Sequence, residues 1–496
     1  MQYHSTRGLA PSVDSADAVL LGLASDGGLY LPQSVPAFDW QKCVAKDTMG
    51  MATQILSAFL PDIPEMEELV RRAYTGKFQT DDLTPTVPVG DFTVLELFRG
   101  PTSAFKDVAL SMLPQLMTAA KSAKGMGEDI LILTATSGDT GKAALAGFQD
   151  VPGIRICVFY PDGGVSQVQR AQMVTQEGGN VHVCAVRGNF DDAQTGVKNI
   201  FTACQGKDLP FRLSSANSIN IGRLAPQVMY YFKAYKDLMD AGKIRLGDQV
   251  NFSVPTGNFG NILAGYLAKQ LGLPVGMLIC ASNSNDVLTE FLNTGRYNRI
   301  RLFHKTLSPS MDILVSSNLE RLLYLMSGCD CGLVADLMAK LNTDGRYHVP
   351  DYLFARIRRE FRGYNCGDLT GQMAIRKVWK EHGYLMDTHT AAGWVAAEKY
   401  TQETGDDRPM VVLSTASPYK FPAAVLTAVT AEDVPLEKLA SALLKAPEGD
   451  EFDHMEQLEA ITGVKIPKNL SGLREKPERH TGVIDKDAML EFVLGL

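Results

Sequence analysis

Glu96-Leu-Phe-Arg-Gly-Pro-Thr-Ser-Ala-Phe-Lys106-Asp-Val-Ala-Leu110 carries the strongest single signal in this chain of 496 residues. A Gly-Pro-Thr turn precedes Lys106, and Phe105 gives the lysine an apolar neighbour. A lysine that forms a Schiff base must spend time unprotonated, and burial lowers the pKa of a lysine towards that state. Most lysines are solvated surface residues instead, which is the alternative here. The setting of Lys106 favours a Schiff-base lysine.

Downstream of this stretch, apolar strands alternate with polar loops and helices. Residues 129–136 form a continuous apolar run, which is typical of a strand buried on both faces. A helix is expected from Lys142 and another from Ile262. Further strands are expected at 154–160, 180–186, 249–254, 274–281 and 409–415. This alternation predicts right-handed βαβ units, mostly parallel sheets and the α/β fold class.

The chain divides into four expected parts, which its length allows at roughly 100–200 residues per domain. Residues 1–95 form an N-terminal domain, and residues 96–247 form an α/β domain that carries Lys106. Residues 248–430 form a second α/β domain with a charged, helical insertion at about 295–385. Residues 431–496 form a polar C-terminal extension that is expected to pack outside the sheets.

Composition excludes several classes of partner. The net charge of −8 offers no basic face for nucleic acid or anionic lipid, and no run of eighteen apolar residues predicts a membrane span. The eight cysteines lie mostly in apolar segments, and their spacing predicts no metal site. We therefore expect reduced thiols in a cytoplasmic protein.

The segment Thr256-Gly-Asn-Phe-Gly-Asn261 lies between an expected strand and an expected helix. Two glycines let several backbone N–H groups converge at a helix N-terminus, where the positive end of the dipole favours phosphate. A plain βα turn is the alternative. The pattern matches neither the dinucleotide fingerprint nor the NTP-binding loop, so neither ligand is implied.

Three further polar segments are candidates for ligand contacts, and each has a structural alternative. Ser137-Gly-Asp-Thr-Gly-Lys142 can hold a carboxylate or simply cap a helix, and it lacks the residues of an NTP-binding loop. Thr415 ends a buried strand, which is where parallel sheets bind ligands, or it marks a strand-to-turn junction. Arg223, in the segment 217–223, offers a bidentate fork for a phosphate or carboxylate. His389 has either a chemical or a purely structural role.

Taken together, these segments resemble the threonine synthases, which are pyridoxal-phosphate enzymes of the fold-type II group. The resemblance runs nearly end to end and matches the longer form of bacteria and fungi, which is not activated by S-adenosylmethionine. It implies two fold-type II α/β domains with mostly parallel sheets, an N-terminal segment and a helical insertion. The matching segments are 3–8, 26–30, 100–107, 135–141, 217–223, 255–261, 387–391 and 415–421.

The resemblance implies the roles of the site residues. Lys106 should form the internal aldimine with pyridoxal 5'-phosphate and shuttle protons, with Phe105 beside it. Thr415 should hydrogen-bond the pyridine nitrogen, and Asp139 should lie near the cofactor O3′. The cofactor phosphate should be held by Gly257, Asn258, Phe259, Gly260 and Asn261. The substrate O-phospho-L-homoserine should meet Thr102, Ser137, Thr140, Asn217, Ser218 and Arg223, with Ser308, Ser310 and Asp312 as weaker candidates.

The implied reaction converts O-phospho-L-homoserine and water to L-threonine and phosphate, in a monomer or homodimer. A related phospholyase, which releases an α-keto acid and ammonia with the phosphate, is the alternative. A serine/threonine dehydratase is disfavoured because those enzymes usually carry Ser-x-Asn-x-x-Gly at the carboxylate-binding loop, whereas residues 137–141 of this chain are Ser-Gly-Asp-Thr-Gly. The intact Lys106 argues against a non-catalytic binding protein. The chain departs from many relatives at Arg99 and Ser417, where a histidine is common, which leaves the substrate end less defined.

Overall fold

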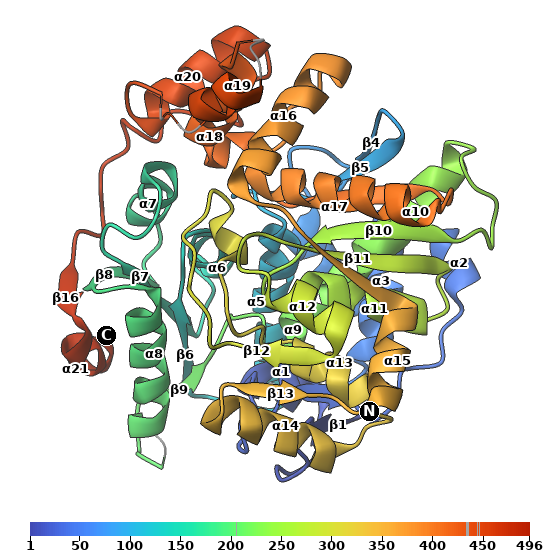
Figure 1. Ribbon diagram of the computed structural model, residues 1–496. Coiled ribbons are helices and arrows are strands. Elements are labelled where there is room, and N and C mark those ends of the chain that lie inside the picture. The colour runs from blue at the N-terminus through green and yellow to red at the C-terminus, as the bar shows by residue number, and fades with distance from the viewer. Residues whose placement is uncertain (205, 433–435, 444, 446) are drawn as a thin grey trace.

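The computed structural model describes residues 1–204, 206–432, 436–443, 445 and 447–496. Two α/β units, each a sheet with its covering helices and here called a layer, lie side by side, with the N-terminal elements behind and below them (Figure 1). Helices between residues 422 and 462 lie at the top, whereas the last helix lies at the lower left beside the C-terminus. The segment that leads to Lys106 connects the two layers, so the site is built where they meet.

A six-stranded sheet forms the first layer, with neighbouring strands in the order β14-β11-β10-β15-β5-β4. All its pairs are parallel except β4–β5, which is antiparallel. Helix α17 packs against β10, β11 and β15, and α11 packs against β10 and β11. The strands are β4 (Thr86–Val89), β5 (Phe92–Glu96), β10 (Val250–Pro255), β11 (Val275–Ser282), β14 (Phe361–Asn365) and β15 (Met410–Ser414), and the helices are α10 (Val228–Asp240), α11 (Gly260–Gln270), α12 (Val287–Thr294), α16 (Asp368–His382) and α17 (Thr388–Thr404).

A five-stranded, fully parallel sheet forms the second layer, in the order β16-β8-β7-β6-β9. Helix α8 packs on β6 and β7, and α5 packs on α6. The strands are β6 (Asp129–Ala135), β7 (Ile154–Pro161), β8 (Val181–Arg187), β9 (Phe211–Ser214) and β16 (Val483–Asp485), and the helices are α5 (Lys106–Ala123), α6 (Asp139–Phe148), α7 (Gln167–Val174), α8 (Phe190–Cys204) and α9 (Ile221–Leu224) with η1 (Ala225–Gln227).

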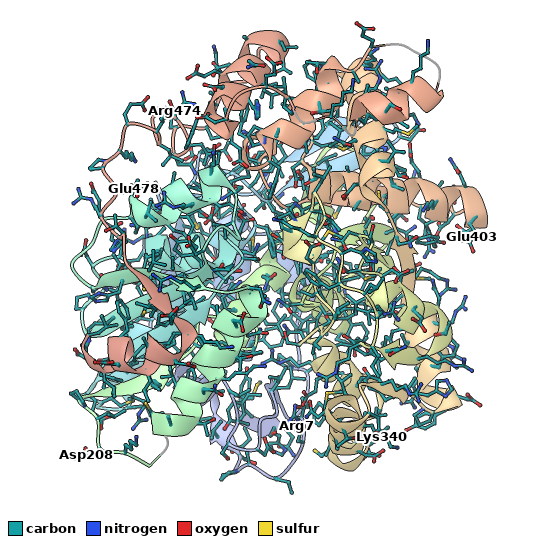
Figure 2. The ribbon with its side chains drawn as sticks, turned by 60° about the vertical axis from the view of Figure 1, so that its left-hand side comes forward. Arg7, Asp208, Lys340, Glu403, Arg474 and Glu478 are labelled. Carbon is teal, nitrogen blue, oxygen red and sulfur yellow. The ribbon has the colours of Figure 1, made fainter. Side chains whose placement is uncertain are left out.

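The N-terminal segment packs under both layers. Its short antiparallel sheet has the order β2-β1-β3, and α1 and α4 pack on α5 while α3 packs on α10. Arg7 pairs bidentately with Glu320 at 2.9 Å, which fixes this segment near the insertion (Figure 2). The elements are β1 (Gln2–Ser5), β2 (Val13–Asp14), α1 (Ser15–Leu21), β3 (Tyr30–Pro32), α2 (Trp40–Val44), α3 (Thr48–Phe59) and α4 (Met66–Tyr74).

The inserted segment and the C-terminal segment complete the molecule. The labelled residues Arg474 and Glu478 mark the chain as it descends from the upper helices along the outer edge, where Glu478 pairs with Arg170 of α7 (Figure 2). The inserted elements are β12 (Arg296–Asn298), η2 (Pro309–Met311), α13 (Leu319–Met326), α14 (Cys331–Thr343), β13 (Arg346–His348) and α15 (Asp351–Glu360). The C-terminal elements are η3 (Pro418–Lys420), α18 (Pro422–Thr430), α19 (Leu436–Leu443), α20 (Glu451–Thr462), η4 (Lys486–Ala488) and α21 (Met489–Leu494).

The predicted α/β class and parallel sheets are confirmed, and most predicted strands lie within a residue or two of those observed. Two predicted helices start earlier than expected, at Asp139 rather than Lys142 and at Gly260 rather than Ile262. In both cases the polar loop already forms the first helical turn, and such loops read as irregular in a sequence.

Sheet connectivity differs from the expected boundaries in three places. Strand β14 lies inside the predicted 295–385 insertion but pairs with β11, and β5 of the predicted N-terminal domain pairs with β15. Strand β16 pairs with β8, so the expectation that the extension packs outside the sheets is wrong for residues 483–485. Strands β14 and β16 lie at sheet edges and are partly exposed, so neither has the apolar pattern of a buried strand. The division into domains itself stays a prediction.

Within the described ranges, no helix combines the length and apolar character that crossing a bilayer requires. The same residues contain no cluster of three metal-ligating side chains. All eight cysteines are free thiols, and only Cys329 is fully exposed.

Candidate active site

Lys106 is the first residue of α5, directly after the Gly-Pro-Thr turn. The turn is held against the end of β15, because the Phe105 amide donates to the Thr415 carbonyl at 2.8 Å. Asp107 closes the turn by accepting from the Thr102 amide at 2.9 Å. A Cβ on Gly100 would lie 2.4 Å from the Asp107 side chain, so this position requires glycine. The turn therefore delivers Lys106 to the junction of the two layers.

The Lys106 side chain is buried, with only 8% of the residue exposed. Its Nζ lies 3.5 Å from Asp139 Oδ2, 3.4 Å from Ser310 Oγ and 5.0 Å from the centre of the Phe105 ring. Burial lowers the pKa of Lys106 and outweighs the opposing effect of Asp139, while Lys420 and Arg223 lower it further. The surface alternative is thus excluded, and burial acts on the Lys106 pKa in the direction that a Schiff-base lysine requires.

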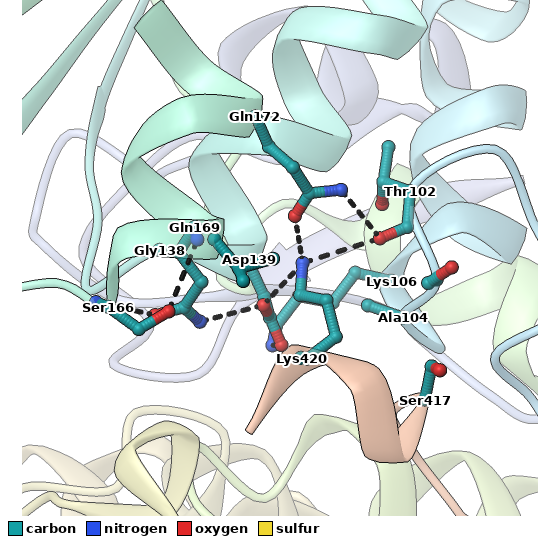
Figure 3. Close-up of polar contacts among 12 residues, drawn as sticks. Thr102, Ala104, Lys106, Gly138, Asp139, Ser166, Gln169, Gln172, Ser417 and Lys420 are labelled. Carbon is teal, nitrogen blue, oxygen red and sulfur yellow. Dashed lines mark hydrogen bonds and ion pairs between the residues drawn. The ribbon is translucent and has the colours of Figure 1, made fainter. Parts of the chain in front are cut away.

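Asp139 lies at the start of α6 between two buried lysines (Figure 3). Its Oδ1 atom is 3.0 Å from Lys420 Nζ and accepts from Gln169 Nε2 at 2.9 Å. Burial acts to raise the pKa of the Asp139 carboxyl, but Lys420 and then Lys106 hold it well below its usual range. Asp139 is therefore an ionised carboxylate between the two layers.

The segment 256–261 joins β10 to α11 and forms a tight cradle. Phe259 adopts a left-handed conformation, with φ of 61°, and precedes the first turn of α11. A Cβ on Gly257 would lie 2.6 Å from the Ser310 carbonyl oxygen, so only glycine fits there. The carbonyls turn outward: that of Gly257 accepts from Ser316 Oγ at 2.7 Å, and that of Asn258 accepts from Asn318 Nδ2 at 3.1 Å. This leaves the N–H side and the N-terminus of α11 facing the cradle, as anion binding requires.

Asn261 adds a side-chain donor to the cradle. Its Oδ1 accepts from the hydroxyls of Tyr230 at 2.6 Å and Tyr231 at 3.0 Å, which fixes the amide orientation. The buried Nδ2 has no partner among the described residues. An orphaned, buried donor beside a glycine cradle fits an oxygen of a bound phosphate, since buried polar groups are otherwise paired.

Thr415 follows β15 and is buried, and its carbonyl contacts the turn before Lys106. The carboxyl ends of β10 and β15 thus bring the cradle, Thr415 and Lys106 to one edge of the sheet. Pyridoxal phosphate carries an aldehyde, a phosphate and a pyridine nitrogen. The site offers an amine, an anion cradle and a hydroxyl, so its residues fit this cofactor.

Arg223 lies on α9 and is buried, with 3% of the residue exposed. One Nη donates to the Ala216 carbonyl at 2.5 Å, while Nε lacks a partner and no carboxylate within the described chain forms an ion pair with the guanidinium. Burial lowers its pKa to about 10. A buried charge without a counter-ion is costly, so Arg223 is expected to meet an anion from outside the chain.

The other predicted substrate residues differ in how accessible they are. Asn217 and Ser218 are half-buried on the segment that leads to Arg223, and Ser137 and Thr140 are half-buried beside Asp139. The Thr102 hydroxyl instead donates to Asp107 Oδ1 at 2.5 Å in a fully buried contact. The turn thus uses the proton of the Thr102 hydroxyl internally, and a contact of Thr102 with substrate stays a prediction.

Of the three weaker candidates, only Ser310 approaches Lys106. Asp312 Oδ1 accepts from Asn283 at 2.7 Å and from the Thr306 hydroxyl at 2.7 Å, and Ser308 Oγ accepts from Asn283 at 3.2 Å. These contacts close the loop internally, so Ser308 and Asp312 act in shaping it.

His389 supports the same loop. Its Nε2 accepts from the Ser310 amide at 3.1 Å, and its Nδ1 lies 2.7 Å from Asp387 Oδ2. Because Nε2 is the acceptor, the ring proton resides on Nδ1 and is donated to Asp387. His389 thus positions Ser310 rather than touching Lys106.

The two departures from the expected pattern leave the reacting end intact. Arg99 pairs with Glu96 at 2.5 Å and lies over the Phe98 ring. Ser417 caps η3 by accepting from the Tyr419 amide at 3.3 Å, and its own amide donates to the Ser103 carbonyl.

Two completely buried cations, Lys420 and Arg321, were not predicted. Lys420 lies within the segment 415–421, which follows the end of a predicted strand. That position was the one feature of the sequence that could have indicated a role for Lys420 in the site. Arg321 of α13 is fully buried and donates to the Tyr30 and Ile219 carbonyls and to Asn318. Nothing in the sequence indicated its burial, because two of its partners, Tyr30 and Ile219, come from distant segments.

Three family models match the chain. They are described as threonine synthase N terminus, over residues 2–74, pyridoxal-phosphate dependent enzyme, over residues 82–416, and threonine synthase C-terminal, over residues 390–493. The middle match contains Lys106, the cradle and Arg223.

Individual relatives agree with these matches. The chain is 41% identical over 432 residues to a threonine synthase of Pseudomonas aeruginosa, in an alignment that covers 86% of this chain and 90% of that protein. It is 37% identical over 439 residues to human threonine synthase-like 1, covering 84% of this chain and 58% of that longer protein. It superposes on the solved structure of PLP-bound threonine synthase from Brucella melitensis with a TM-score of 0.84 at 38% identity, covering 100% of this chain and 99% of that one.

Proposed function

The chain belongs to the threonine synthase family of pyridoxal-phosphate-dependent enzymes, and we propose that the site around Lys106 converts O-phospho-L-homoserine and water to L-threonine and phosphate. The observation that carries the proposal is a buried lysine near two candidate anion sites, the cradle at 257–261, which adjoins Ser310, and the guanidinium of Arg223. A substrate and a cofactor that each bear a phosphate match these two sites.

The two anion sites are joined by a buried chain of hydrogen bonds. The Arg223 carbonyl accepts from Gln227 Nε2 at 2.7 Å, and Gln227 Oε1 accepts from the Tyr230 hydroxyl at 3.0 Å. The same hydroxyl also lies 2.6 Å from Asn261 Oδ1, so its single proton is shared between the two acceptor oxygens. This chain supports a fixed spacing between cofactor phosphate and substrate phosphate, with the reacting carbons between them.

The cofactor is held by four groups in this proposal. Lys106 would bind its aldehyde carbon, the N–H groups and the Asn261 amide of the cradle would hold its phosphate, and the Thr415 hydroxyl would meet its pyridine nitrogen. When bound, pyridoxal phosphate supplies an electron sink that stabilises negative charge on the substrate carbons.

Lys106 is the acid and base of the proposed reaction. Its amine, favoured in the neutral form by burial, takes the proton from the substrate α-carbon. The β-carbon then loses a proton and the C–O bond at the γ-carbon breaks, so that phosphate leaves with the bonding electrons. Water adds its oxygen at the β-carbon, protons return to the α- and γ-carbons, and L-threonine forms. The departed phosphate is close enough in this scheme to take the proton from water.

Arg223 has two tasks in the scheme. Its guanidinium anchors the phosphate of the substrate and then stabilises the additional negative charge on the leaving phosphate, which is electrostatic catalysis in a buried site. Asn217 and Ser218 complete that pocket, and Ser137 and Thr140 meet the substrate carboxylate at the N-terminus of α6.

Product analysis tests the proposal. The purified protein is incubated with pyridoxal phosphate and O-phospho-L-homoserine, and phosphate, threonine and α-ketobutyrate are measured together. One threonine for each phosphate is the expected result. One α-ketobutyrate for each phosphate would contradict it and indicate the phospholyase reaction, in which water fails to attack the β-carbon.

We also propose that the protein works in the cytoplasm as a monomer or homodimer without nucleic acid. The free thiols and the net charge of −8 support this environment. Light scattering on the purified protein measures the oligomeric state, and a larger assembly would contradict the proposal.

A further inference from the structure

Lys420 is a completely buried lysine that the reaction scheme does not use. It lies at the end of η3, and its Nζ is 3.0 Å from Asp139 Oδ1 and 3.3 Å from the Thr102 carbonyl (Figure 3). Gln172 of α7 provides a third acceptor through its Oε1. All three ammonium hydrogens therefore have an acceptor, as a buried charge requires.

Asp139 is shared unequally between Lys420 and Lys106. Its Oδ1 is occupied by Lys420 at 3.0 Å and Gln169 at 2.9 Å, whereas its Oδ2 lies 3.5 Å from Lys106. Lys106 has only Ser310 Oγ, at 3.4 Å, as a further polar contact within the described chain. Of the two lysines, Lys420 thus has the more complete set of hydrogen-bond acceptors and is the main counter-ion of Asp139.

This sharing matters because an isolated buried lysine–carboxylate pair stabilises the charged lysine. A base that removes a proton from carbon must instead be available as the neutral amine. A second cation on the same carboxylate satisfies Asp139 and repels positive charge on Lys106. Lys106 then loses its proton more readily than it would beside Asp139 alone.

We propose that Lys420 is a positioning residue for Lys106, which neutralises Asp139 from the side opposite Lys106 and so keeps the Lys106 amine available as a base. The inference rests on the proposed function in taking Lys106 as the reacting amine. Lys420 also ties η3 to α6, α7 and the turn that precedes Lys106, so it fixes Asp139 in orientation.

Charged residues on several neighbouring elements act on the two lysines. Lys106 is influenced by Asp139 of α6, Lys420 of η3 and Arg223 of α9. Lys420 additionally influences Asp107 of α5 and Lys142 of α6, and His389 of α17 influences Asp139. Removal of the Lys420 charge therefore leaves Asp139 as the main charge acting on Lys106, with Arg223 opposing it, and the pKa of Lys106 rises.

The test measures how the acetylation rate of Lys106 depends on pH, by peptide mass spectrometry on the full-length chain after any bound pyridoxal phosphate has been removed. Only the neutral amine reacts, so the midpoint reports its loss of a proton. In Lys420→Met we expect the midpoint to rise by about one pH unit, which is a tenfold slower reaction below the midpoint. Lys420→Gln removes the charge but keeps hydrogen-bond donors, so it replaces Lys420→Met in the test if that variant does not fold. The same rise of the midpoint is expected.

Two further variants separate this role from a purely structural one. Lys420→Arg keeps the charge and should return the midpoint to that of the unchanged protein. Lys142→Met removes another, half-buried lysine, which contacts Gln176 instead of Asp139, and should leave the midpoint where it was. An unshifted midpoint in folded Lys420→Met or Lys420→Gln, or an equal shift in Lys142→Met, would overturn the proposal.

Failure of the proposed function would look different. If the protein without substitutions does not attach pyridoxal phosphate at Lys106, or yields no threonine, the proposed function is contradicted. The acetylation midpoints are measured independently of that result and still decide the role of Lys420.

Discussion

The Ser310 amide donates a hydrogen bond of 3.1 Å to His389 Nε2. Ser310 Oγ lies 3.4 Å from Lys106 Nζ, so the histidine determines where one of the polar contacts of the lysine lies. Asp387 in turn determines the tautomer of the histidine by accepting from Nδ1. The Asp387–His389–Ser310 series thus links the start of α17 to the reacting amine.

Asp387→Asn tests this series with almost no change in shape. The asparagine amide can donate to Nδ1, which moves the ring proton to Nε2. The Nε2–H group and the Ser310 N–H are then two donors that face each other and repel. A displaced Ser310 loop should lower kcat by about 10- to 100-fold, because misplacement by about 1 Å has costs of this size. Steady-state kinetics measures the effect.

His389→Gln is the matched comparison, since its side-chain oxygen can accept from the Ser310 amide without a tautomer. It should retain more activity than Asp387→Asn. Full activity in Asp387→Asn, with the fold unchanged by circular dichroism, would rule out the positioning role of His389.

Arg223→Met removes the unpaired buried guanidinium. Because hydrogen bonds to charged groups contribute about 1.5–3 kcal/mol, kcat/KM for O-phospho-L-homoserine should fall about 10- to 100-fold or more. Thermal stability should stay equal or rise, since replacing a buried charge by an apolar side chain is often neutral or stabilising. A large loss of Tm together with unchanged kcat/KM would show that Arg223 acts in folding rather than in phosphate binding.

Gly257→Ala tests the cradle. The added Cβ would lie 2.6 Å from the Ser310 carbonyl oxygen, a backbone atom, so the 256–261 segment must shift. Affinity for pyridoxal phosphate, measured by absorbance or fluorescence titration, should fall at least tenfold. Gly127→Ala is the control, because no atom lies within 4 Å of its Cβ, and it should bind the cofactor as before. Equal affinity in the two variants would contradict the assignment of the cradle.

Asn261→Asp exchanges the orphaned donor for an oxygen at constant shape. The Tyr230 and Tyr231 hydroxyls can still donate to the side chain, so folding should be preserved. A carboxylate oxygen facing a phosphate repels it, and the Kd for pyridoxal phosphate should rise about 10- to 100-fold, the equivalent of one hydrogen bond to a charged group. An unchanged Kd would mean that the amide faces something other than the cofactor phosphate.

Local chemistry accounts for the parts of the site that could be predicted from the sequence. Lys106 follows a Gly-Pro-Thr turn, and the glycines of 256–261 follow a buried strand, so turn chemistry and strand ends suffice to locate them. The apolar runs at β6, β7 and β10 likewise predicted strands because both faces are buried.

The remaining parts depend on contacts between distant residues. Lys420 meets Asp139 and Gln172 only after the two layers come together, and nothing in its own segment specifies an acidic partner. Thr102 was expected to meet the substrate, and the donation of its hydroxyl to Asp107 within the turn could not be predicted from the sequence. Strands β14 and β16 were missed because edge strands are partly exposed and carry polar residues.

The most direct measurement locates the lysine that attaches the cofactor. The protein is incubated with pyridoxal phosphate, reduced with borohydride, digested and analysed by mass spectrometry. Two other lysines, the buried Lys420 and the half-buried Lys142, lie in the same region and compete as candidates. An adduct on Lys106 alone is the predicted result, and an adduct on Lys420 or Lys142, or an undiminished adduct in Lys106→Ala, would contradict it.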